Sequence, residues 1–518
     1  MRIGIDVGGT HTDAVVLDAQ DVISSTKVLT SANVKDGVIN ALDEILEDSG
    51  VEYSAIEAVM IGTTQFTNAV IARRDLAPTA IIRIALPSGE MVPPMIDWPE
   101  DIAEALGRHV YMIHGGRTYD GFPIASLVDD EIDAAIGDIA AKGIGHIAIA
   151  GVFSPSDPAQ EEYVAGRIRN RIPAARITQS HNIGRMGILE RENAALLNAS
   201  LLPLADKVVQ SFASALEDRQ IACPFYISQN DGTLMSADFA AEFPALTFAS
   251  GPTNSLRGAS LLTQLTEAIV VDIGGTTSDI GVLQGGFPRQ SNIAIEVGGV
   301  RTNFRMPDIQ SIGLGGGSLV QNDGATIGPG SVGYRLVTDG LVFGGETLTT
   351  TDIIVAAGTA NIGDASKVSG LDANLVATAV NKIHSIVDNG IDQMKSSRDP
   401  VPVVLVGGGA ILVSRSLATA SEIHRPEHSG VANAIGAANA QVGSEMERIV
   451  SYRRIPRDKV IDEMTSQLRA DLAKAGADGE TIKIADIEEM AISYMADDST
   501  RIRVKMVGDL SLAGGGRN

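Results

Sequence analysis

Two distant stretches of the chain carry the same arrangement of apolar and polar positions. Residues 2–7 (RIGIDV) and 13–18 (DAVVLD) are apolar runs separated by a turn that contains Gly-Gly-Thr. Residues 269–284 (IVVDIGGTTSDIGVLQ) repeat this arrangement 266 residues later. Short apolar runs on either side of a glycine-containing turn are typical of β-hairpins. We therefore predict two equivalent hairpins, one at the start of each half of the chain.

Between the two hairpins, apolar runs of strand length alternate with stretches of helical periodicity. The pattern predicts strands at residues 58–64, 79–86, 146–153, 176–181 and 225–232. It predicts helices at residues 34–50, 129–143, 157–173 and 188–219. Such alternation indicates parallel sheets with helices on their faces, and hence an α/β protein.

The pattern changes near the C-terminal end of the sequence. Apolar residues recur there at every fourth position and predict one face of a helix, formed by Val460, Met464, Leu468 and Leu472. Residues 491–508 then predict two strands joined by a turn at Asp497-Asp498-Ser499. We therefore expect a first half over residues 1–267, a second half over 268–445, and a small C-terminal α+β segment over 446–518.

Net charge argues against some classes of partner. The 518 residues include 40 Lys+Arg and 64 Asp+Glu, which gives a formal charge of −24. A surface for nucleic acid or for an anionic membrane needs a basic footprint, so we expect neither partner. An anion site built from backbone N–H groups needs no basic side chains and stays compatible with this charge.

Cysteine content and hydropathy bear on reactivity and location. The single cysteine, Cys223, excludes a disulfide within the chain and a cysteine-rich zinc site. We interpret Cys223 as a small core residue, with a nucleophilic role as the alternative. The N-terminal residues enter a strand pattern at once, and no apolar run approaches the roughly 18 residues of a membrane span. We therefore expect a cytoplasmic protein.

The two Gly-Gly-Thr turns are suited to binding phosphate. Glycines let backbone N–H groups approach an anion closely, and a threonine hydroxyl adds a further donor. The candidate phosphate-binding residues are Gly8, Gly9, Thr10, Gly274, Gly275, Thr276 and Thr277. Asp6 and Asp272 end the preceding strands, where a carboxylate can hold Mg²⁺ beside phosphates. Two such turns that face one cleft would hold a triphosphate from both sides.

Other phosphate-binding motifs fit this sequence less well. It contains no G-x-x-x-x-G-K-[ST] segment, so a P-loop is not expected. A Rossmann fingerprint opens a helix, whereas both Gly-Gly-Thr turns lead into a second strand pattern. The repeated hairpin therefore remains the best candidate for a phosphate site.

Further polar residues are candidates for catalysis and substrate binding, each with a structural alternative. Asp13 and Asp279 begin the second strands, where they either orient Thr10 and Thr276 or act as a base. The candidates for the substrate cleft are Thr63, Thr64 and Asn68. The alternative for this segment is an ordinary helix N-cap after a strand.

Glycine runs and histidines also leave alternatives open. Gly315 and Gly316, in a run over residues 313–317, either contact a nucleotide or permit tight packing. His424 and His428 have the spacing of a helical zinc pair, but Pro426 lies between them. We therefore favour a polar loop for these two histidines, and a loop position for His181 as well.

Taken in order, these motifs resemble the actin, Hsp70 and sugar-kinase superfamily. DVGGTHTD and DIGGTTSD resemble its two phosphate segments, and SGVANAIGAANA (429–440) resembles its connecting helix. VLVGGGA (404–410) resembles its adenosine segment, which implies nucleotide contacts at Gly407, Gly408 and Gly409. The resemblance implies a duplicated actin-like (ribonuclease H-like) ATPase fold that binds ATP and Mg²⁺.

Other segments narrow the resemblance to the hydantoinase A/oxoprolinase family. They are GTTQFTNAV (62–70), ILERENAALLNASLLP (188–203), GTLMSADFA (232–240), SGP (250–252) and IGLGGGSL (312–319). The resemblance implies ATP-dependent ring opening of a cyclic amide, such as a hydantoin, a lactam or a 5-oxoproline-like compound, by phosphorylation of the amide oxygen. It also implies an oligomer or a second, β-type subunit. A small-molecule kinase and a regulatory ATP-binding module are the alternatives.

Overall fold

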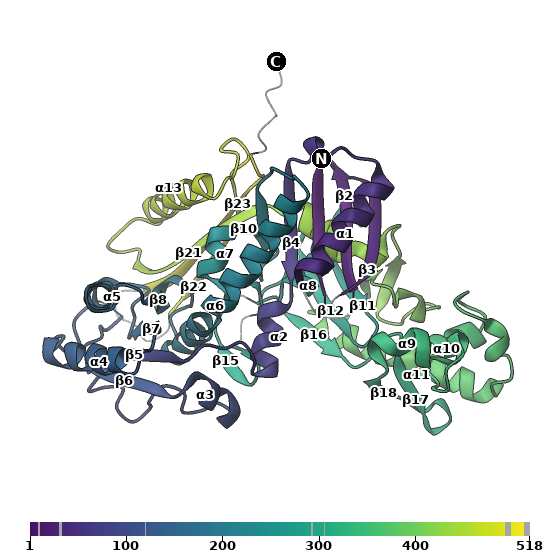
Figure 1. Cartoon of the computed structure of the whole chain (residues 1–518), viewed down its shortest axis with the longest axis horizontal. Helices are drawn as coiled ribbons and strands as arrows, with labels where there is room; N and C mark the ends of the chain where they lie inside the picture. The colour runs from purple at the N-terminus through teal and green to yellow at the C-terminus, as the bar shows by residue number, and fades with distance from the viewer. Residues whose placement is uncertain are drawn as a thin grey trace, which may run out of the picture.

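The computed structural model describes residues 1–8, 11–30, 34–119, 121–291, 294–304, 306–492 and 499–511. Two large sheets and a smaller parallel sheet are covered by helices (Figure 1). No helix within the described ranges is long and apolar enough to cross a membrane. Gly9, Thr10 and the predicted turn residues Asp497 and Asp498 lie outside the described residues.

The first predicted hairpin lies within a nine-stranded sheet of order β22-β23-β21-β10-β9-β4-β1-β2-β3. Strand β1 (Arg2–Val7) runs antiparallel to β2 (His11–Asp18) and parallel to β4 (Ala58–Thr63). Strand β2 is antiparallel to β3 (Asp21–Leu29), and β4 is parallel to β9 (Phe225–Ser228). The apolar runs of β1 and β4 are almost wholly buried, as expected for strands covered on both faces.

The second hairpin repeats this arrangement in a second sheet. Strand β11 (Ala268–Ile273) is antiparallel to β12 (Ser278–Gln284) and parallel to β19 (Val401–Val406). Strand β12 is antiparallel to β16 (Ile309–Ile312), and β19 is parallel to β20 (Ala420–His424). The neighbours of both hairpins therefore share one order and one set of directions, which confirms the predicted duplicated actin-like fold.

Residues between β4 and β9 form a separate parallel sheet of order β6-β5-β7-β8. Its strands are β5 (Thr79–Leu86), β6 (His109–His114), β7 (His146–Gly151) and β8 (Arg176–Gln179). Its helices are α3 (Glu100–Leu106), α4 (Asp129–Ala141) and α5 (Ala159–Arg171). The long helix α6 (Ile188–Asp218) packs both on β7 and on α1 (Val34–Ser49), so it joins this region to the first sheet.

Two helices cross where the halves meet. Helix α8 (Ser250–Thr263) packs on β11, β12 and β19 of the second sheet, and α12 (Ala432–Ala438) packs on β1, β2 and β4 of the first. A Cβ atom on Gly258 would lie 1.9 Å from the carbonyl oxygen of Ala432, and one on Gly436 would lie 1.8 Å from that of Asn254. Only glycine fits at these two positions, so the two backbones touch.

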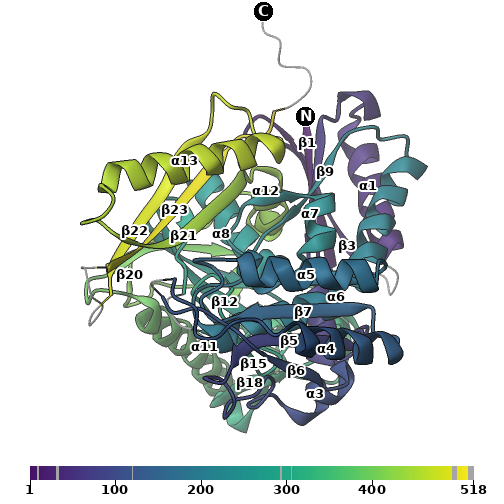
Figure 2. The ribbon, with the colours of Figure 1, turned by 90° about the vertical axis from the view of Figure 1, so that its left-hand side faces the viewer.

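The C-terminal segment extends the first sheet. Strand β21 (Val442–Ser451) pairs with β10 (Leu234–Ser236), and β23 (Ser499–Gly508) lies between β21 and β22 (Lys483–Ala491). Helix α13 (Arg457–Lys474) lies along these strands (Figure 2). Its buried residues are Val460, Met464, Leu468 and Leu472, which confirms the predicted helix face.

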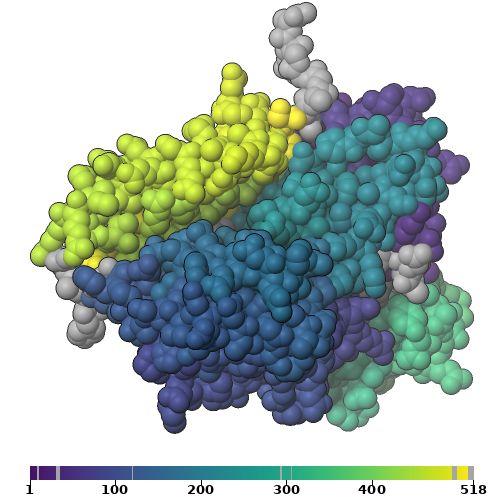
Figure 3. Space-filling view, turned by 60° about the vertical axis from the view of Figure 1, so that its left-hand side comes forward, coloured from purple at the N-terminus to yellow at the C-terminus, as the bar shows by residue number. Residues whose placement is uncertain are grey.

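The predicted C-terminal hairpin has a different first strand from the one expected. Strand β22 covers residues 483–491, whereas the pattern placed both strands within 491–508. The segment KIADIEEMA is mostly exposed at the edge of the sheet, so its charged residues hide the strand pattern. Figure 3 shows the C-terminal segment (yellow-green) lying along the inserted parallel-sheet region (blue).

Further elements complete the second half and the connections. The helices are α2 (Gln65–Ala72), α7 (Ala237–Glu242), α9 (Leu336–Asp339), α10 (Thr350–Ala356) and α11 (Ala373–Met394). The strands are β13 (Phe287–Pro288), β14 (Ile295–Val297), β15 (Val300–Thr302), β17 (Ser318–Gln321) and β18 (Thr326–Ser331). In Figure 1, α9, α10, α11, β17 and β18 form one lobe at the right, beside the second sheet.

Candidate functional site

Each hairpin brings a pair of aspartates to the end of its sheet. Asp6 lies opposite Asp13 in the register of β1 and β2, and Asp272 lies opposite Asp279 in that of β11 and β12. Residues directly opposite one another on antiparallel strands project to the same face. The repeated sequence therefore folds into a repeated pair of neighbouring carboxylates.

Each turn is closed by a hydrogen bond within its own backbone. The N–H of Gly8 donates to the carbonyl of His11 at 3.0 Å, and that of Gly274 donates to the carbonyl of Thr277 at 2.9 Å. The N–H groups of Gly8 and Gly274 are therefore already used within the turns. What these glycines offer a ligand is a backbone that it can approach closely. Gly275, the next residue of the second turn, is exposed.

A cavity of about 380 Å³ lies between the halves, and both turns line it. Its volume is in the range of small-molecule sites. Residues from the first half that line it are Gly8, His11, Asp13, Lys27, Leu29 and Ser255. Those from the second half include Asp272, Gly274, Gly275, Gly316, Gly407, Gly408 and Gly409. The prediction that the two hairpins face one cleft is therefore confirmed.

The turn after β19 requires glycine at its first position. Gly407 has φ +81°, and a Cβ atom there would lie 2.3 Å from Oδ1 of Asp272. The N–H of Gly409 donates to the carbonyl of Ile273 at 2.7 Å, which holds this turn against the end of β11. The predicted adenosine segment thus lies directly beside the second phosphate turn.

An apolar wall completes this end of the cavity. The lining side chains there include Tyr334, Val337, Phe343, Ile362 and Ile411. Tyr334 is 68% exposed and Val337 is 61% exposed, although both are large and apolar or aromatic. Such surface next to a glycine turn is suited to the flat face of a nucleobase.

The glycine run over residues 313–317 packs on the second turn. The N–H of Gly316 donates to the carbonyl of Gly274 at 3.0 Å, and that of Gly317 donates to the carbonyl of Gly275 at 2.7 Å. A Cβ atom on Gly315 would lie 2.5 Å from the backbone nitrogen of Thr276. Tight packing is therefore one role of this run, and Gly316 also lines the cavity.

Several predicted site residues do not line the cavity that the described residues form. Asp6 is 4% exposed and lies behind the wall, and the carboxylate of Asp279 accepts a hydrogen bond from Ser311. Thr276 and Thr277 are exposed on the second turn. Of the four strand-end aspartates, Asp13 and Asp272 reach the cavity.

The candidate substrate residues lie at the end of β4, also outside that wall. Thr63 is the buried last residue of β4, and Thr64 is the N-cap residue of α2 without a side-chain capping bond. The amide of Asn68 donates to Thr64 Oγ1 at 3.3 Å. They lie at a helix start, as the alternative expects, next to the strand end that carries Asp6, but Thr64 makes no capping bond, so the substrate role stays a prediction.

Burial governs the electrostatics of the aspartates. The pKa of Asp6 is raised to about 6, first by burial and then by the charge of Asp13, against two asparagine amides that lower it. The pKa of Asp272 is also raised to about 6 by burial, against a hydrogen bond from Ser255. Burial likewise raises the pKa of Asp279. Ionisation of these carboxylates costs free energy, which a bound cation would offset.

The residues present fit a hydrated magnesium ion that is shared with a phosphate ligand. Asp13 and Asp272 offer carboxylate oxygens at the cavity, and Lys27 Nζ lies 2.5 Å from Asp13 Oδ1. Within the described ranges, no group of three or more His, Cys, Asp or Glu is arranged to hold a metal. Mg²⁺ commonly keeps several waters and binds one or two carboxylates plus phosphates, so it needs no all-protein cage.

A buried polar atom next to Asp6 has no partner among the described residues. Oδ1 of Asn254, a fully buried residue, accepts no hydrogen bond from any of them. Its amide nitrogen donates to Asp6 Oδ1 at 3.4 Å. Asn254 lies behind the cavity wall together with Asp6, so the fit of Mg²⁺ rests on the carboxylates of Asp13 and Asp272.

Three polar residues of the site were missed by the sequence analysis. Lys27 pairs with Asp13, Ser255 Oγ donates to Asp272 Oδ2 at 2.5 Å, and Asn433 Nδ2 donates to Asp13 Oδ2 at 2.8 Å. Each side chain comes from a segment far from its partner or from a different element. The available signals were that Asn433 lies in a segment noted for its resemblance (429–440) and that Ser255 follows another (SGP, 250–252) by three residues.

His181 and His428 lie in turns, as expected, and the half-buried Cys223 packs against the core of the first half, whereas the polar-loop prediction is wrong for His424. His181 is in a short turn after β8, with Nδ1 2.7 Å from Oε2 of the buried Glu161. His424 is the last residue of β20, where it pairs with Val404 of β19, so the loop begins only after it. His428 precedes the short turn that leads to α12. Burial raises the pKa of the Cys223 thiol to about 11, so the thiol stays protonated at neutral pH.

The duplicated fold, with glycine turns of both halves on one cavity, defines a protein of the actin-like ATPase fold class. The chain belongs to the hydantoinase/oxoprolinase family. The hydantoinase/oxoprolinase N-terminal region matches residues 2–172, and the hydantoinase/oxoprolinase region matches residues 191–366. The family predicted from the motifs is therefore confirmed.

Known relatives share the sequence over part of their length. Caprolactamase subunit alpha of Pseudomonas jessenii is 24% identical over 393 residues, which cover 69% of this chain and 54% of that protein. Acetophenone carboxylase gamma subunit of Aromatoleum aromaticum is 23% identical over 392 residues, which cover 69% of this chain and 53% of that protein. The chain thus spans about half the length of these relatives.

A solved structure shares the fold over nearly the whole chain. The crystal structure of ATP-dependent caprolactamase from Pseudomonas jessenii has a TM-score of 0.81 to this chain at 18% identity. The match covers 98% of this chain and 87% of that chain. The common fold therefore includes the region outside the two family matches.

Proposed function

We propose that this chain is the ATP-binding component of an enzyme that opens a cyclic amide, such as a hydantoin, a lactam or a 5-oxoproline-like compound. The observation that carries the proposal is the single cavity lined by the glycine turns and strand-end aspartates of both halves. Membership of the hydantoinase/oxoprolinase family supports it. The fold shared with the ATP-dependent caprolactamase from Pseudomonas jessenii supports it as well.

The first role of the site is to hold the nucleotide. Gly8 and Gly274 let the phosphates approach the turns, and Gly275 and Thr276 supply donors on the second turn. The glycine turn over residues 407–409 lies against the nucleoside, and the neighbouring apolar wall contacts its base. Gly9 and Thr10 carry the matching role on the first turn in this proposal.

The second role is to hold and balance charge at the phosphates. We assign Asp272 to hold Mg²⁺, because its carboxylate is at the cavity whereas Asp6 is behind the wall. When bound, Mg²⁺ supplies positive charge that neutralises the oxygens of the transferred phosphoryl group. Lys27 adds a positive charge beside Asp13, and Asp13 is the better placed of the two candidate bases because Asp279 is outside the wall.

The third role is activation of the amide. The amide oxygen attacks the γ-phosphorus as the bond to ADP breaks, which gives an activated imidate phosphate. Water then adds to the carbon, and the ring C–N bond breaks as the nitrogen takes a proton. A second water attacks the resulting acyl phosphate at carbon and releases inorganic phosphate that carries the former amide oxygen. The products are an open-chain amino acid, ADP and phosphate.

A further polypeptide is part of the proposal. Two relatives are subunits by name, and this chain spans about half of their length. Thr64 and Asn68 are outside the cavity wall, so their assignment to a substrate site requires a surface that completes the cleft. We therefore propose that a β-type subunit or a second copy of the chain supplies later steps of ring opening.

Phosphate release measured against a panel of cyclic amides tests this function. Hydantoin, caprolactam and 5-oxoproline are incubated with the chain, Mg²⁺ and ATP, with and without the product of a neighbouring gene. The expected result is phosphate release that depends on one amide and matches ring-opened product in a one-to-one ratio. A stable phosphorylated product indicates a kinase instead, and slow ATP hydrolysis that no amide changes indicates a regulatory ATP-binding module.

A further inference from the structure

The two crossing helices carry the same short motif at or just before their first residues. Residues 250–254 read SGPTN and residues 429–433 read SGVAN, so Asn254 and Asn433 hold the same place in the motif. The motif opens α8 itself, whereas in the second half it spans a short turn at Ser429–Val431 and the first two residues of α12. These motifs are 179 residues apart, whereas the hairpins are 266 residues apart. The spacings differ because the parallel sheet inserted between β4 and β9 lengthens the first half alone.

Both asparagines donate to the same carboxylate. Asn433 Nδ2 lies 3.0 Å from Asp6 Oδ2, and Asn254 Nδ2 lies 3.4 Å from Asp6 Oδ1. Asn433 Nδ2 also donates to Asp13 Oδ2 at 2.8 Å. On the neighbouring strand, a Cβ atom at Gly62 would lie 2.2 Å from Asp6 Oδ1. The carboxylate of Asp6 is therefore held by two amides and a close glycine.

Helix α8 reaches the aspartates of both halves through consecutive residues. Asn254 contacts Asp6, and Ser255 Oγ donates to Asp272 Oδ2 at 2.5 Å. Both residues are almost fully buried. Since α8 and α12 also touch through their glycines, the spacing between Asp6 and Asp272 depends on this helix crossing.

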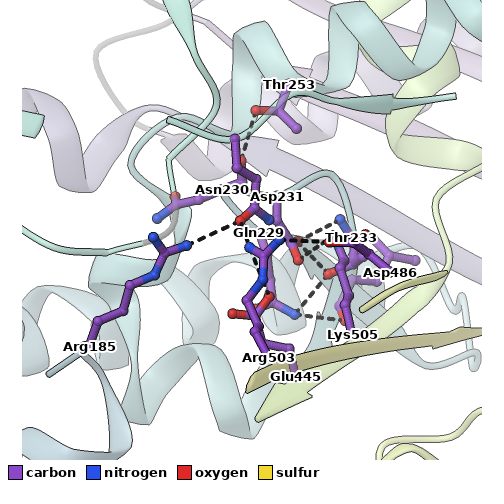
Figure 4. A network of polar contacts seen from close by, with 12 residues as sticks. Arg185, Gln229, Asn230, Asp231, Thr233, Thr253, Glu445, Asp486, Arg503 and Lys505 are labelled. Carbon is purple, nitrogen blue, oxygen red and sulfur yellow. Dashed lines mark hydrogen bonds and ion pairs between the residues drawn. The ribbon is translucent and has the colours of Figure 1, made fainter. Parts of the chain in front are cut away.

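The other side of α8 is anchored by a polar network (Figure 4). Thr253 Oγ1 donates to the carbonyl of Asn230 at 2.9 Å, and Lys505 Nζ lies 2.8 Å from Oδ2 of the neighbouring Asp231. Lys505 is on β23, so a strand of the C-terminal segment braces the loop that holds α8. These contacts hold α8 in place, and with it the side chains that contact Asp6 and Asp272.

We propose that Asn254 of α8 and Asn433 of α12 are positioning residues that fix the Asp6 carboxylate beside Asp13. In this way they set the geometry in which Mg²⁺ and nucleotide bind. This inference rests on the proposed nucleotide site. A neutral amide on each oxygen orients the carboxylate without neutralising it. The alternative is that the amides merely satisfy a buried carboxylate and contribute only to stability.

The test compares Asn433→Ala and Asn254→Ala with a matched control. Asn198→Ala removes a fully buried helical asparagine whose amide donates to Thr178 and to the backbone of Glu242, outside the cavity wall. The readouts are Mg²⁺-dependent binding of a non-hydrolysable ATP analogue by calorimetry, and the thermal unfolding midpoint. We expect Asn433→Ala to weaken binding roughly tenfold or more, as loss of a hydrogen bond to a charged group does. The control should lower the midpoint and leave binding unchanged.

A double-mutant cycle separates positioning from stability. If the asparagines act through Asp6, then Asn433→Ala should lower the affinity for the ATP analogue by less than about a further twofold in a protein that already carries Asp6→Asn. The proposal would be overturned if the loss of affinity in the double mutant equalled the product of the two single-mutant losses. It would also be overturned if the alanine variants bound the ATP analogue as tightly as the wild type. If either alanine variant fails to fold, Asn433→Ser and Asn254→Ser replace it, because serine keeps a polar group but is too short to reach Asp6.

The same binding measurements test the positioning role separately from the proposed nucleotide site. A wild-type chain that binds no ATP analogue with Mg²⁺ contradicts the proposed nucleotide site itself. A wild type that binds, together with asparagine variants that bind equally well, contradicts only the positioning role.

Discussion

The substitution Asp272→Asn separates the chemical role of this residue from its effect on stability. It keeps the size of the side chain and removes the charge that is assigned to hold Mg²⁺. The carboxylate it replaces ends β11, accepts a hydrogen bond from Ser255, and lines the cavity. The substitution should therefore reduce function without disturbing the packing of the sheet.

The stability effect has a definite sign. Burial raises the pKa of Asp272 from 3.8 to about 6 in the folded protein. The folded state therefore binds more protons than the unfolded state between these pH values, and stability falls as pH rises through this window. A shift of roughly two units corresponds to at most about 3 kcal/mol of destabilisation above pH 6. Asparagine carries no such penalty.

Asp272→Asn should thus be more stable than the wild type at neutral pH, by up to a few degrees in thermal midpoint. The gap between the two midpoints should shrink as pH falls from about 7 towards 4. Mg²⁺-dependent nucleotide affinity should fall roughly ten- to a hundredfold, because loss of a charged interaction in a partly desolvated site costs about 1.5–3 kcal/mol.

The assay pairs thermal unfolding across pH with calorimetry of ATP-analogue binding and with phosphate release. Asp388→Asn is the control, because the pKa of Asp388 is lowered: burial alone would raise it, but hydrogen bonds from Thr419 and Ala418 outweigh that effect. The control should therefore lose stability at neutral pH and keep phosphate release. An Asp272→Asn protein that is less stable at neutral pH, or that keeps normal Mg²⁺-dependent turnover, would refute the reasoning.

Three further predictions follow from single residues. Gly407→Ala places a Cβ atom 2.3 Å from the Asp272 carboxylate at a φ of +81°, so it should cost about 1–3 kcal/mol in chemical denaturation and also weaken nucleotide binding; unchanged binding by calorimetry would count against the site. Cys223 has a pKa raised to about 11 by burial, so iodoacetamide should label it slowly at pH 8 and Cys223→Ser should keep full phosphate release. Burial alone would raise the pKa of Glu161, but the hydrogen bond and charge of His181 lower it overall from its ordinary value of 4.5. Glu161→Gln should therefore be less stable than the wild type at pH 7, and the gap in stability should shrink as the pH falls below 4.5; a constant gap would contradict this.

Local sequence patterns predicted the parts of the fold that depend on nearby residues. The two hairpins could be predicted because their strands and turns lie within about 20 residues, and the four-residue period of α13 is a local feature as well. The family resemblance extended this to the duplicated fold and to the turn over residues 407–409. The edge strand β22 was missed because exposed charged residues mask its pattern.

The parts of the site that could not be predicted depend on contacts between distant residues. Asn433 and Asp13 are 420 positions apart, and Asn254 and Asp6 are 248 positions apart. Periodicity within one segment carries no information on which segment it meets. The same limit applies to cavity access: Asp6 and Asp272 occupy equivalent places in the repeat, but only tertiary packing puts Asp272 at the cavity and Asp6 behind it.

The fate of the amide oxygen tests the proposed chemistry most directly. The cyclic amide that stimulates phosphate release is prepared with a heavy isotope of oxygen in its carbonyl group and turned over with Mg²⁺ and ATP. Mass analysis of the products then locates the isotope. Phosphorylation of the amide oxygen, followed by attack of water at carbon, predicts the isotope in inorganic phosphate. An isotope found wholly in the ring-opened acid, with unlabelled phosphate, would contradict it.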